Sequence, residues 1–68
     1  MNDSMPGVSL GNAAAFHQTD KAICVLSDEY GEQWIPKSQI HDDSEIWKEG
    51  QEGELVVTEW YAKQKGWV

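Results

Sequence analysis

The feature of this 68-residue chain that most limits its fold is the apolar run Ala-Ile-Cys-Val-Leu at residues 22–26. A run this short and rich in β-branched side chains is typical of a strand covered on both faces. Residues 27–31 then supply turn-forming side chains ending in glycine, and extended structure resumes at Trp34 and Ile35. Residues 21–36 are therefore predicted to form a β-hairpin, with Trp34 and Ile35 on opposite faces of its second strand.

The segment after the hairpin carries signals for two more strands. Pro36 lacks an amide hydrogen, so the second strand should end there or lie at a sheet edge. Residues 37–40 are expected to form a tight turn or one turn of 3₁₀ helix that returns Ile40 to the core. Residues 46–47 are a candidate short strand, and residues 54–58 are predicted to form a longer one.

The C-terminal residues 58–66 are predicted to be helical. Thr58 suits the N-cap, and Glu59 in the first turn and Lys63 in the last suit the helix dipole. Gly66 fits the position after the C-cap, and Trp67 is expected to fold back on the apolar side of the helix. The alternative is a single strand over residues 54–62 with Trp60 pointing inward.

Residues 1–20 show neither a strand-like alternation nor a helical stripe, and they include Pro6 and two glycines. They are predicted to be a flexible N-terminal leader, with a short docked helical turn as the alternative. Residues 21–68 are then the folded domain. The predicted fold class is mainly β (small α+β): an SH3-like partly open barrel, or a curled antiparallel sheet of three or four strands, with a short C-terminal helical turn.

A domain of this size buries only about 60% of its unfolded surface, so its core must be small. The four tryptophans and two tyrosines are expected to supply much of it, with one or two rings partly exposed. Cys24 is the only cysteine, which rules out an intrachain disulfide, and two histidines leave too few ligands for a structural zinc site. We expect Cys24 to be a buried free thiol in a reducing setting.

The chain has no apolar run of membrane-spanning length and no signal-peptide pattern, so a cytoplasmic location is predicted. Twelve acidic side chains face five lysines, arginine is absent, and the formal charge is −7. Binding to duplex nucleic acid depends on Lys and Arg neutralising phosphates, and Arg is the commonest reader of guanine. Duplex nucleic acid and anionic membranes are therefore unfavourable partners.

Residues 41–54 hold six carboxylates and one lysine. On a small domain they are expected to form a negative face that attracts a basic partner or imitates a phosphate backbone. The alternative is an acidic surface that only keeps the protein soluble. The candidate partner-binding residues of this segment are Asp42, Asp43, Glu45, Trp47 and Glu49.

A second group of candidates is aromatic and lies near the C-terminus. Trp60 and Trp67 are close in sequence to Lys63 and Lys65, the only local cluster of lysines. An exposed ring next to a lysine suits either a hot spot for a protein partner or a platform on which single-stranded bases stack. Trp60, Lys63 and Trp67 are therefore added as candidate partner-binding residues.

Catalytic and metal sites are not expected. Ser38, His41 and Asp42 lie close in sequence, but the members of a catalytic triad come from separate elements and need an oxyanion hole. Residues 41–45 lack the ligand spacing and the central glycine of an EF-hand loop. We predict no enzymatic activity, no cofactor and no metal.

Two motifs resemble a small module of uncharacterised bacterial and bacteriophage proteins. They are Trp-Ile-Pro-Lys-Ser-x-Ile at residues 34–40 and Gly-x-Leu-Val-Val-x-x-Trp at residues 53–60, and the resemblance covers about residues 21–67. The resemblance implies a bacterial or phage setting. It implies no activity and transfers no site residue.

The predicted function is that of a non-enzymatic small acidic binding module that acts by protein–protein contact and modulates or inhibits a nucleic-acid-processing complex. The second hypothesis is a single-stranded nucleic-acid-binding accessory domain that uses exposed aromatics and the C-terminal lysines. The chain is expected to be a monomer, or a weak homodimer paired through an edge strand near Pro36.

Overall fold

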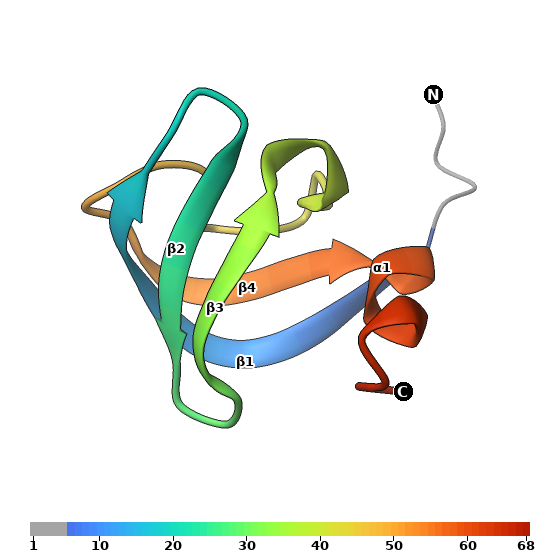
Figure 1. Cartoon of the computed structure of the whole chain (residues 1–68). Coiled ribbons are helices and arrows are strands. Elements are labelled where there is room, and N and C mark those ends of the chain that lie inside the picture. The colour runs from blue at the N-terminus through green and yellow to red at the C-terminus, as the bar shows by residue number, and fades with distance from the viewer. Residues whose placement is uncertain (1–5) are drawn as a thin grey trace.

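The computed structural model, which describes residues 6–68, is a four-stranded antiparallel sheet with one short helix at its C-terminal end. The strand order is β3-β2-β1-β4, and the sheet is not closed into a barrel (Figure 1). This confirms the predicted mainly β fold class in its open form. The elements are β1 (Gly7–Gln18), β2 (Ala22–Ser27), β3 (Gly31–Pro36), the 3₁₀ turn η1 (Lys37–Gln39), β4 (Glu52–Thr58) and α1 (Glu59–Gln64).

β1 overturns the prediction of a flexible leader over residues 1–20 and of its helical alternative, because residues 7–18 form the longest strand. β1 pairs with β4 through residues 7–14 and with β2 through residues 13–18. A register shift between Ser9 and Asn12, with Gly11 at φ 81°, moves its inward-facing set of side chains from Leu10 to Ala13. This bulge interrupts the alternation of buried and exposed residues along β1, so the strand is hard to recognise in the sequence. Residues 1–5 of the predicted leader lie outside the described residues.

The predicted hairpin is confirmed as β2 and β3, paired from Ala22 opposite Pro36 to Ser27 opposite Gly31. The Ser27 hydroxyl accepts hydrogen bonds from the amides of Glu29 and Tyr30, which orders the turn. Gly31 has φ 76°, a conformation that costs other residues roughly 1–2 kcal/mol. The local sequence therefore explains this turn completely.

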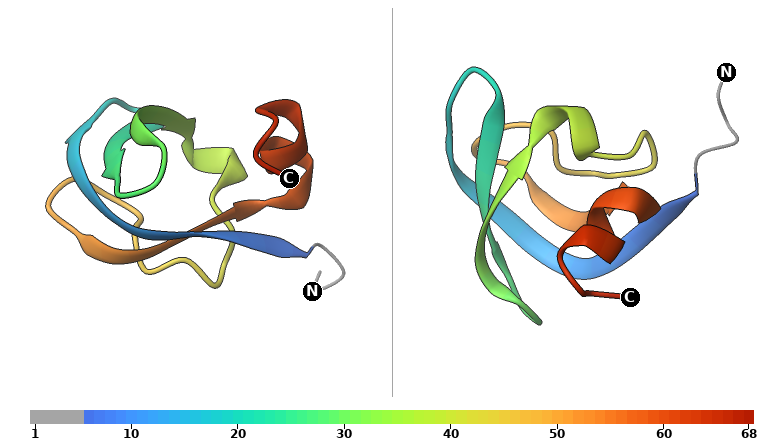
Figure 2. Two further views of the ribbon diagram at one scale, coloured as in Figure 1. Left: turned by 90° about the horizontal axis from the view of Figure 1, so that it is seen from below. Right: turned by 45° about the vertical axis from the view of Figure 1, so that its right-hand side comes forward.

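The segment after the hairpin returns along the free edge of β4. η1 is followed by Ile40, which is buried as predicted. Ile40 also forms an isolated β-bridge with Val57, which the sequence did not predict. The strand predicted at residues 46–47 is wrong, because this segment is irregular and only the Ile46 side chain enters the core. Figure 2 shows how the curled strands and this returning segment enclose a common interior.

The predicted C-terminal helix is confirmed, and the alternative strand over residues 54–62 is wrong. The Thr58 hydroxyl accepts a hydrogen bond from the Tyr61 amide and caps α1. After the helix, Gly66 adopts φ 78°, and the Trp67 amide donates to the Ala62 carbonyl at 2.9 Å, which completes a Schellman motif. Within residues 6–68, no helix is long and apolar enough to cross a membrane.

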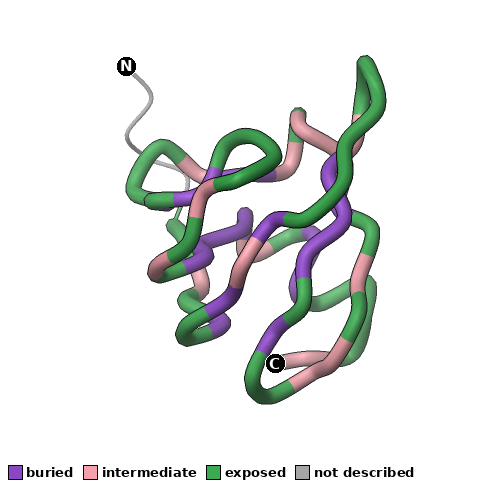
Figure 3. The backbone as a smooth tube through the Cα atoms, turned by 90° about the vertical axis from the view of Figure 1, so that its left-hand side faces the viewer, coloured by how far each residue is buried: buried purple, intermediate pink, exposed green. Residues whose placement is uncertain are grey.

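The core is mainly aliphatic, with Tyr61 as an aromatic member, which corrects the expectation that tryptophans supply much of it. Trp34, Trp47 and Trp60 are 44%, 40% and 59% exposed. β1 contributes the apolar layer that the predicted domain of 21–68 lacked, so the narrow interior is filled without them. Figure 3 shows buried stretches within the strands and mostly exposed residues in the turns between them. The buried core residues include Leu10, Ala13, Ala15, Ile23, Val25, Ile35, Ile40, Ile46, Leu55, Val57, Tyr61 and Ala62.

Candidate functional site

The segment between Ile40 and β4, residues 41–51, forms what we call the acidic connection. Ser44 and Ile46 anchor it to the sheet. The buried Ser44 hydroxyl accepts from the Ile46 amide at 3.1 Å and donates to the Ile46 carbonyl at 3.2 Å. The Ile46 side chain is fully buried. One hydroxyl and one apolar side chain therefore anchor the middle of this irregular segment.

The acidic connection is also bonded to the outer edge of β4. The amides of His41 and Glu45 donate to the carbonyls of Val56 and Glu54, each at 2.9 Å. The Glu45 carboxylate accepts from the Glu54 amide at 2.8 Å. Its Oε1 lies 2.5 Å from the place that a Cβ on Gly53 would occupy, so this contact requires glycine. Glu45 thus holds the connection to β4, a structural task that sequence reasoning did not assign to it.

Trp47 stands at the centre of the acidic connection with its ring 40% exposed. Its indole Nε1–H donates to the Ser44 carbonyl at 2.9 Å. Its backbone amide and that of Lys48 both donate to the Gln51 side-chain oxygen, at 2.5 Å and 2.9 Å. The ring is therefore held in one position on the surface, although it is not buried.

All four predicted carboxylates of this segment, Asp42, Asp43, Glu45 and Glu49, are exposed. The Asp43 amide donates to His41 Nδ1 at 3.0 Å, and the Asp43 carboxylate lies 3.7 Å from the same nitrogen. The Glu49 amide donates to the Gln18 side chain of β1 at 2.7 Å. The backbone of the connection is fixed at both of these positions while the carboxylates stay in solvent.

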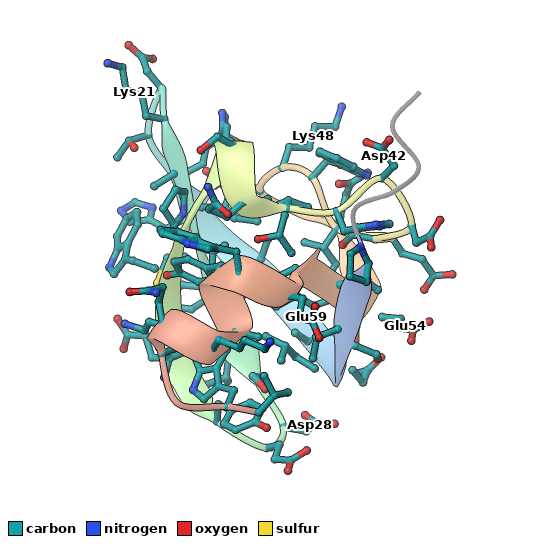
Figure 4. The ribbon with its side chains drawn as sticks, turned by 90° about the vertical axis from the view of Figure 1, so that its right-hand side faces the viewer. Lys21, Asp28, Asp42, Lys48, Glu54 and Glu59 are labelled. Atoms are coloured by element: carbon teal, nitrogen blue, oxygen red, sulfur yellow. The ribbon has the colours of Figure 1, made fainter. Side chains whose placement is uncertain are left out.

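The acidic residues extend beyond this connection. In Figure 4, Asp42 and Glu54 project on the same side of the molecule, whereas Asp28 lies at the distant turn between β2 and β3. Acidic side chains therefore lie on the side of the connection and also at a turn far from it. The connection differs from that turn in carrying the partly exposed indole of Trp47.

Two of the C-terminal candidates, Trp60 and Lys63, form a second surface on α1. Trp60 is 59% exposed and, with Pro6, Glu59 and Lys63, lines a shallow pocket of about 230 Å³. The Lys63 ammonium lies 4.0 Å from the Glu59 carboxylate, one helical turn away. The structure thus places Trp60 and Lys63 together, as predicted from their spacing.

Trp67 differs from Trp60 because its ring packs against the domain. It stacks on Tyr30 of the hairpin turn, with ring centroids 5.0 Å apart, and meets the edge of Tyr61 at 5.9 Å. The Lys65 ammonium lies 6.0 Å from the Trp67 ring centre. This packing joins the end of the chain to the hairpin, as the predicted fold-back of Trp67 requires.

The sequence reasoning did not include Trp34 and Leu26 among the candidate residues. Both are large, apolar and about half exposed, and they lie on the face of β2 and β3 opposite the core. The alternation of Trp34 with the buried Ile35 was the available signal. For Leu26 there was none, because the continuous apolar run suggested burial on both faces.

Cys24 is buried, as predicted, and it has no properties of a reactive thiol. Burial raises the pKa of Cys24, and the nearby Glu32 carboxylate raises it further. The Cys24 thiol donates to Glu32 Oε2 at 3.6 Å. Among residues 6–68, no three His, Cys, Asp or Glu side chains gather closely enough to hold a metal ion.

The chain was compared with protein-family models, with curated proteins and with solved structures, and no match was found in any of the three comparisons.

Proposed function

We propose that this chain is a non-enzymatic acidic protein-binding module whose contact surface is the acidic connection, with Trp47 at its centre. The observation that carries the proposal is the 40% exposed Trp47, whose indole N–H and backbone N–H are both hydrogen-bonded within the connection. Binding costs less when an aromatic side chain is already ordered, and tryptophan is the residue most enriched in interface hot spots. Trp47 meets both conditions.

The charge around Trp47 defines the partner class. Asp42, Asp43 and Glu49 are exposed on the same connection, and the whole chain carries a formal charge of −7. Such a surface attracts proteins with a basic face and speeds their association. Proteins that handle nucleic acid commonly carry such faces. The partner proposed is therefore a basic component of a nucleic-acid-processing complex in a bacterium or a phage-infected cell, which the module modulates or inhibits.

Single-stranded nucleic acid is the less favoured ligand. The lysines that it requires near Trp60 and Trp67 already have partners, because Lys63 faces Glu59 and Lys65 lies over Trp67. Stacking of bases on aromatic rings needs a positively charged groove beside them. A titration with labelled single-stranded oligonucleotide at low salt tests this directly, and saturable quenching of tryptophan fluorescence would reverse the preference.

The main test is capture from a bacterial lysate followed by affinity measurement with the purified captured protein. We expect Trp47→Ala to weaken binding more than tenfold, since truncation of a tryptophan hot spot costs about 2 kcal/mol or more. The double substitution D42K/D43K is expected to slow association and to weaken binding. Glu45 is left unchanged because its carboxylate holds the connection to β4.

A charge-matched control is available in D28K/E29K at the hairpin turn, where both residues are exposed. It changes the net charge by the same amount at a distant place. If D28K/E29K weakens binding as much as D42K/D43K, the partner responds to overall charge alone. That result, or full affinity of Trp47→Ala, contradicts the proposed contact surface.

A further inference from the structure

The outer face of the sheet, on the side away from the core, carries a row of side chains across three strands. Trp34 on β3 pairs with Cys24 on β2, and Cys24 pairs with His17 on β1. The rings of His17 and Trp34 are 6.1 Å apart, and Cys24 between them is 1% exposed. Trp34 itself remains 44% exposed. This row is therefore packed at its base and leaves aromatic surface open.

A second row runs beside the first across all four strands. Glu32 on β3 pairs with Leu26 on β2, Leu26 with Ala14 on β1, and Ala14 with Glu52 on β4. Leu26 is 55% exposed, and both carboxylates are at the surface. The row thus has an apolar centre and a negative charge at each end. Three strand spacings separate the two glutamates, about 14 Å.

One of the two carboxylates is held above this face. Glu32 Oε2 accepts the hydrogen bond of the buried Cys24 thiol at 3.6 Å. Along β3, Glu32 precedes Trp34 by two residues, so both side chains stand on the same face of the sheet. A cation brought to Glu32 would therefore also approach the negative face of an exposed indole, and the two attractions add.

The size of the face decides what can cover it. The outer side of the four strands measures roughly 19 Å across and 20 Å along six residues, or about 400 Å². A stable protein–protein interface takes about 800 Å² from each partner. A second copy of this chain would bury too little area here, and it would bring a second acidic surface. One extended peptide segment matches the area.

We propose that this outer face binds a short extended segment of another protein that carries two basic residues flanking an apolar one. In an extended segment, side chains four residues apart point the same way and lie about 13 Å apart. Lysines at the first and fifth positions then reach Glu32 and Glu52, while the apolar side chain at the third position covers Leu26. The face therefore recognises the pattern basic-x-apolar-x-basic, independently of the Trp47 surface.

The test uses the labelled peptide Gly-Lys-Ser-Leu-Ser-Lys-Gly and amide chemical shifts of the whole chain. We expect shifts centred on Ala14, Leu26 and Glu32. Leu26→Lys should weaken peptide binding at least tenfold. Glu32→Gln and Glu52→Gln should each weaken it roughly two- to fivefold, the usual range for an exposed ion pair.

Two sets of controls distinguish this site from attraction by charge alone and from the surfaces at Trp47 and Trp60. A peptide of the same composition with its lysines adjacent keeps the charge but loses the spacing, and it should bind several-fold more weakly. Trp60→Lys makes an apolar-to-lysine change on α1 like that of Leu26→Lys, and Trp47→Ala removes the indole of the acidic connection. Both variants should bind the peptide with unchanged affinity. Both should also keep the dispersed amide spectrum of a folded protein.

Three results would overturn the proposal: equal affinity for the two peptides, shifts concentrated on residues 41–51, or self-association of the free chain that Leu26→Lys abolishes. The first would mean that only charge is recognised. The second would assign the peptide to the Trp47 surface and leave the proposed function standing. The third would make a second copy the occupant of this face.

Discussion

The β2–β3 hairpin and the acidic connection are both ordered, but by different interactions. The hairpin is held by a continuous ladder of backbone pairs from Ala22–Pro36 to Ser27–Gly31. The acidic connection has no such ladder, and the side chains of Ser44, Glu45 and Gln51 make many of its bonds. A surface built on side-chain bonds can therefore be loosened by one substitution while the sheet survives.

The largest expected effect tests whether the acidic connection belongs to the core. Ile35 in β3 and Ile46 in the connection are both fully buried. Replacing either with alanine should cost about 3 kcal/mol in the free energy of unfolding, a large part of the roughly 5 kcal/mol typical at this size. Urea denaturation followed by tryptophan fluorescence measures both. A cost below about 1 kcal/mol for Ile46→Ala would show that the connection is separate from the core.

The next effect tests whether the side-chain bonds of the acidic connection can be weakened without opening the backbone ladder of the hairpin. Ser44→Ala removes the hydroxyl that bonds both backbone groups of Ile46, and it should cost about 2 kcal/mol. Amide hydrogen exchange should rise in residues 44–51 before it rises in the hairpin. Ser38→Ala, on the exposed surface of η1, is the control and should have almost no effect. Uniform loss of protection would mean that the hairpin and the connection open together.

Two glycines allow the turns of the two regions to be compared. Gly31 ends the hairpin turn at φ 76°, and Gly50 lies in the connection at φ 95°. A Cβ at either position would meet open space, so only backbone strain opposes alanine there. Each substitution should cost about 1 kcal/mol in the free energy of unfolding. A much smaller cost at Gly50 would indicate that the connection relaxes around it.

The smallest expected effect is a loss of stability at alkaline pH caused by two buried groups outside the acidic connection. Burial raises the pKa of Cys24 and of Tyr61, whose hydroxyl donates to the Trp34 carbonyl. An acidic group whose pKa is raised in the folded state adds its full share to the free energy of unfolding at pH values below its pKa in the unfolded chain. That pKa is about 8.5 for cysteine and 10 for tyrosine. The contribution of such a group is lost as pH rises further.

Urea midpoints measured between pH 7 and pH 10.5 test this pH dependence. We expect the midpoint to fall as the pH rises through about 8.5 and above, because the thiol and the phenol ionise more easily in the unfolded chain. Cys24→Ala should make the first part of the fall shallower. A midpoint that stays constant over this range would contradict a raised pKa for both groups.

The elements that were predicted correctly depend on neighbours in the sequence. The turn at Gly31, the return of Ile40, the Thr58 cap and the Gly66 termination each follow from a few adjacent residues. The strand β1 was missed because Gly11 interrupts its alternation and alanines make up much of its inward face. The candidate carboxylates Asp42, Asp43, Glu45 and Glu49 are exposed, although Glu45 also accepts a hydrogen bond within the fold. Trp47 is 40% exposed, whereas the tryptophans were expected to lie mainly in the core.

Local geometry and composition are enough to predict the hairpin, the helix with both of its ends, the buried thiol and the strong negative charge. The place of β1 in the sheet, between β2 and β4, depends instead on long-range packing. That one pairing brings Leu10, Ala13 and Ala15 into the interior and leaves Trp34, Trp47 and Trp60 partly in solvent. Whether a side chain is buried depends on the total apolar surface that the whole chain brings into contact. A local sequence pattern does not determine this total.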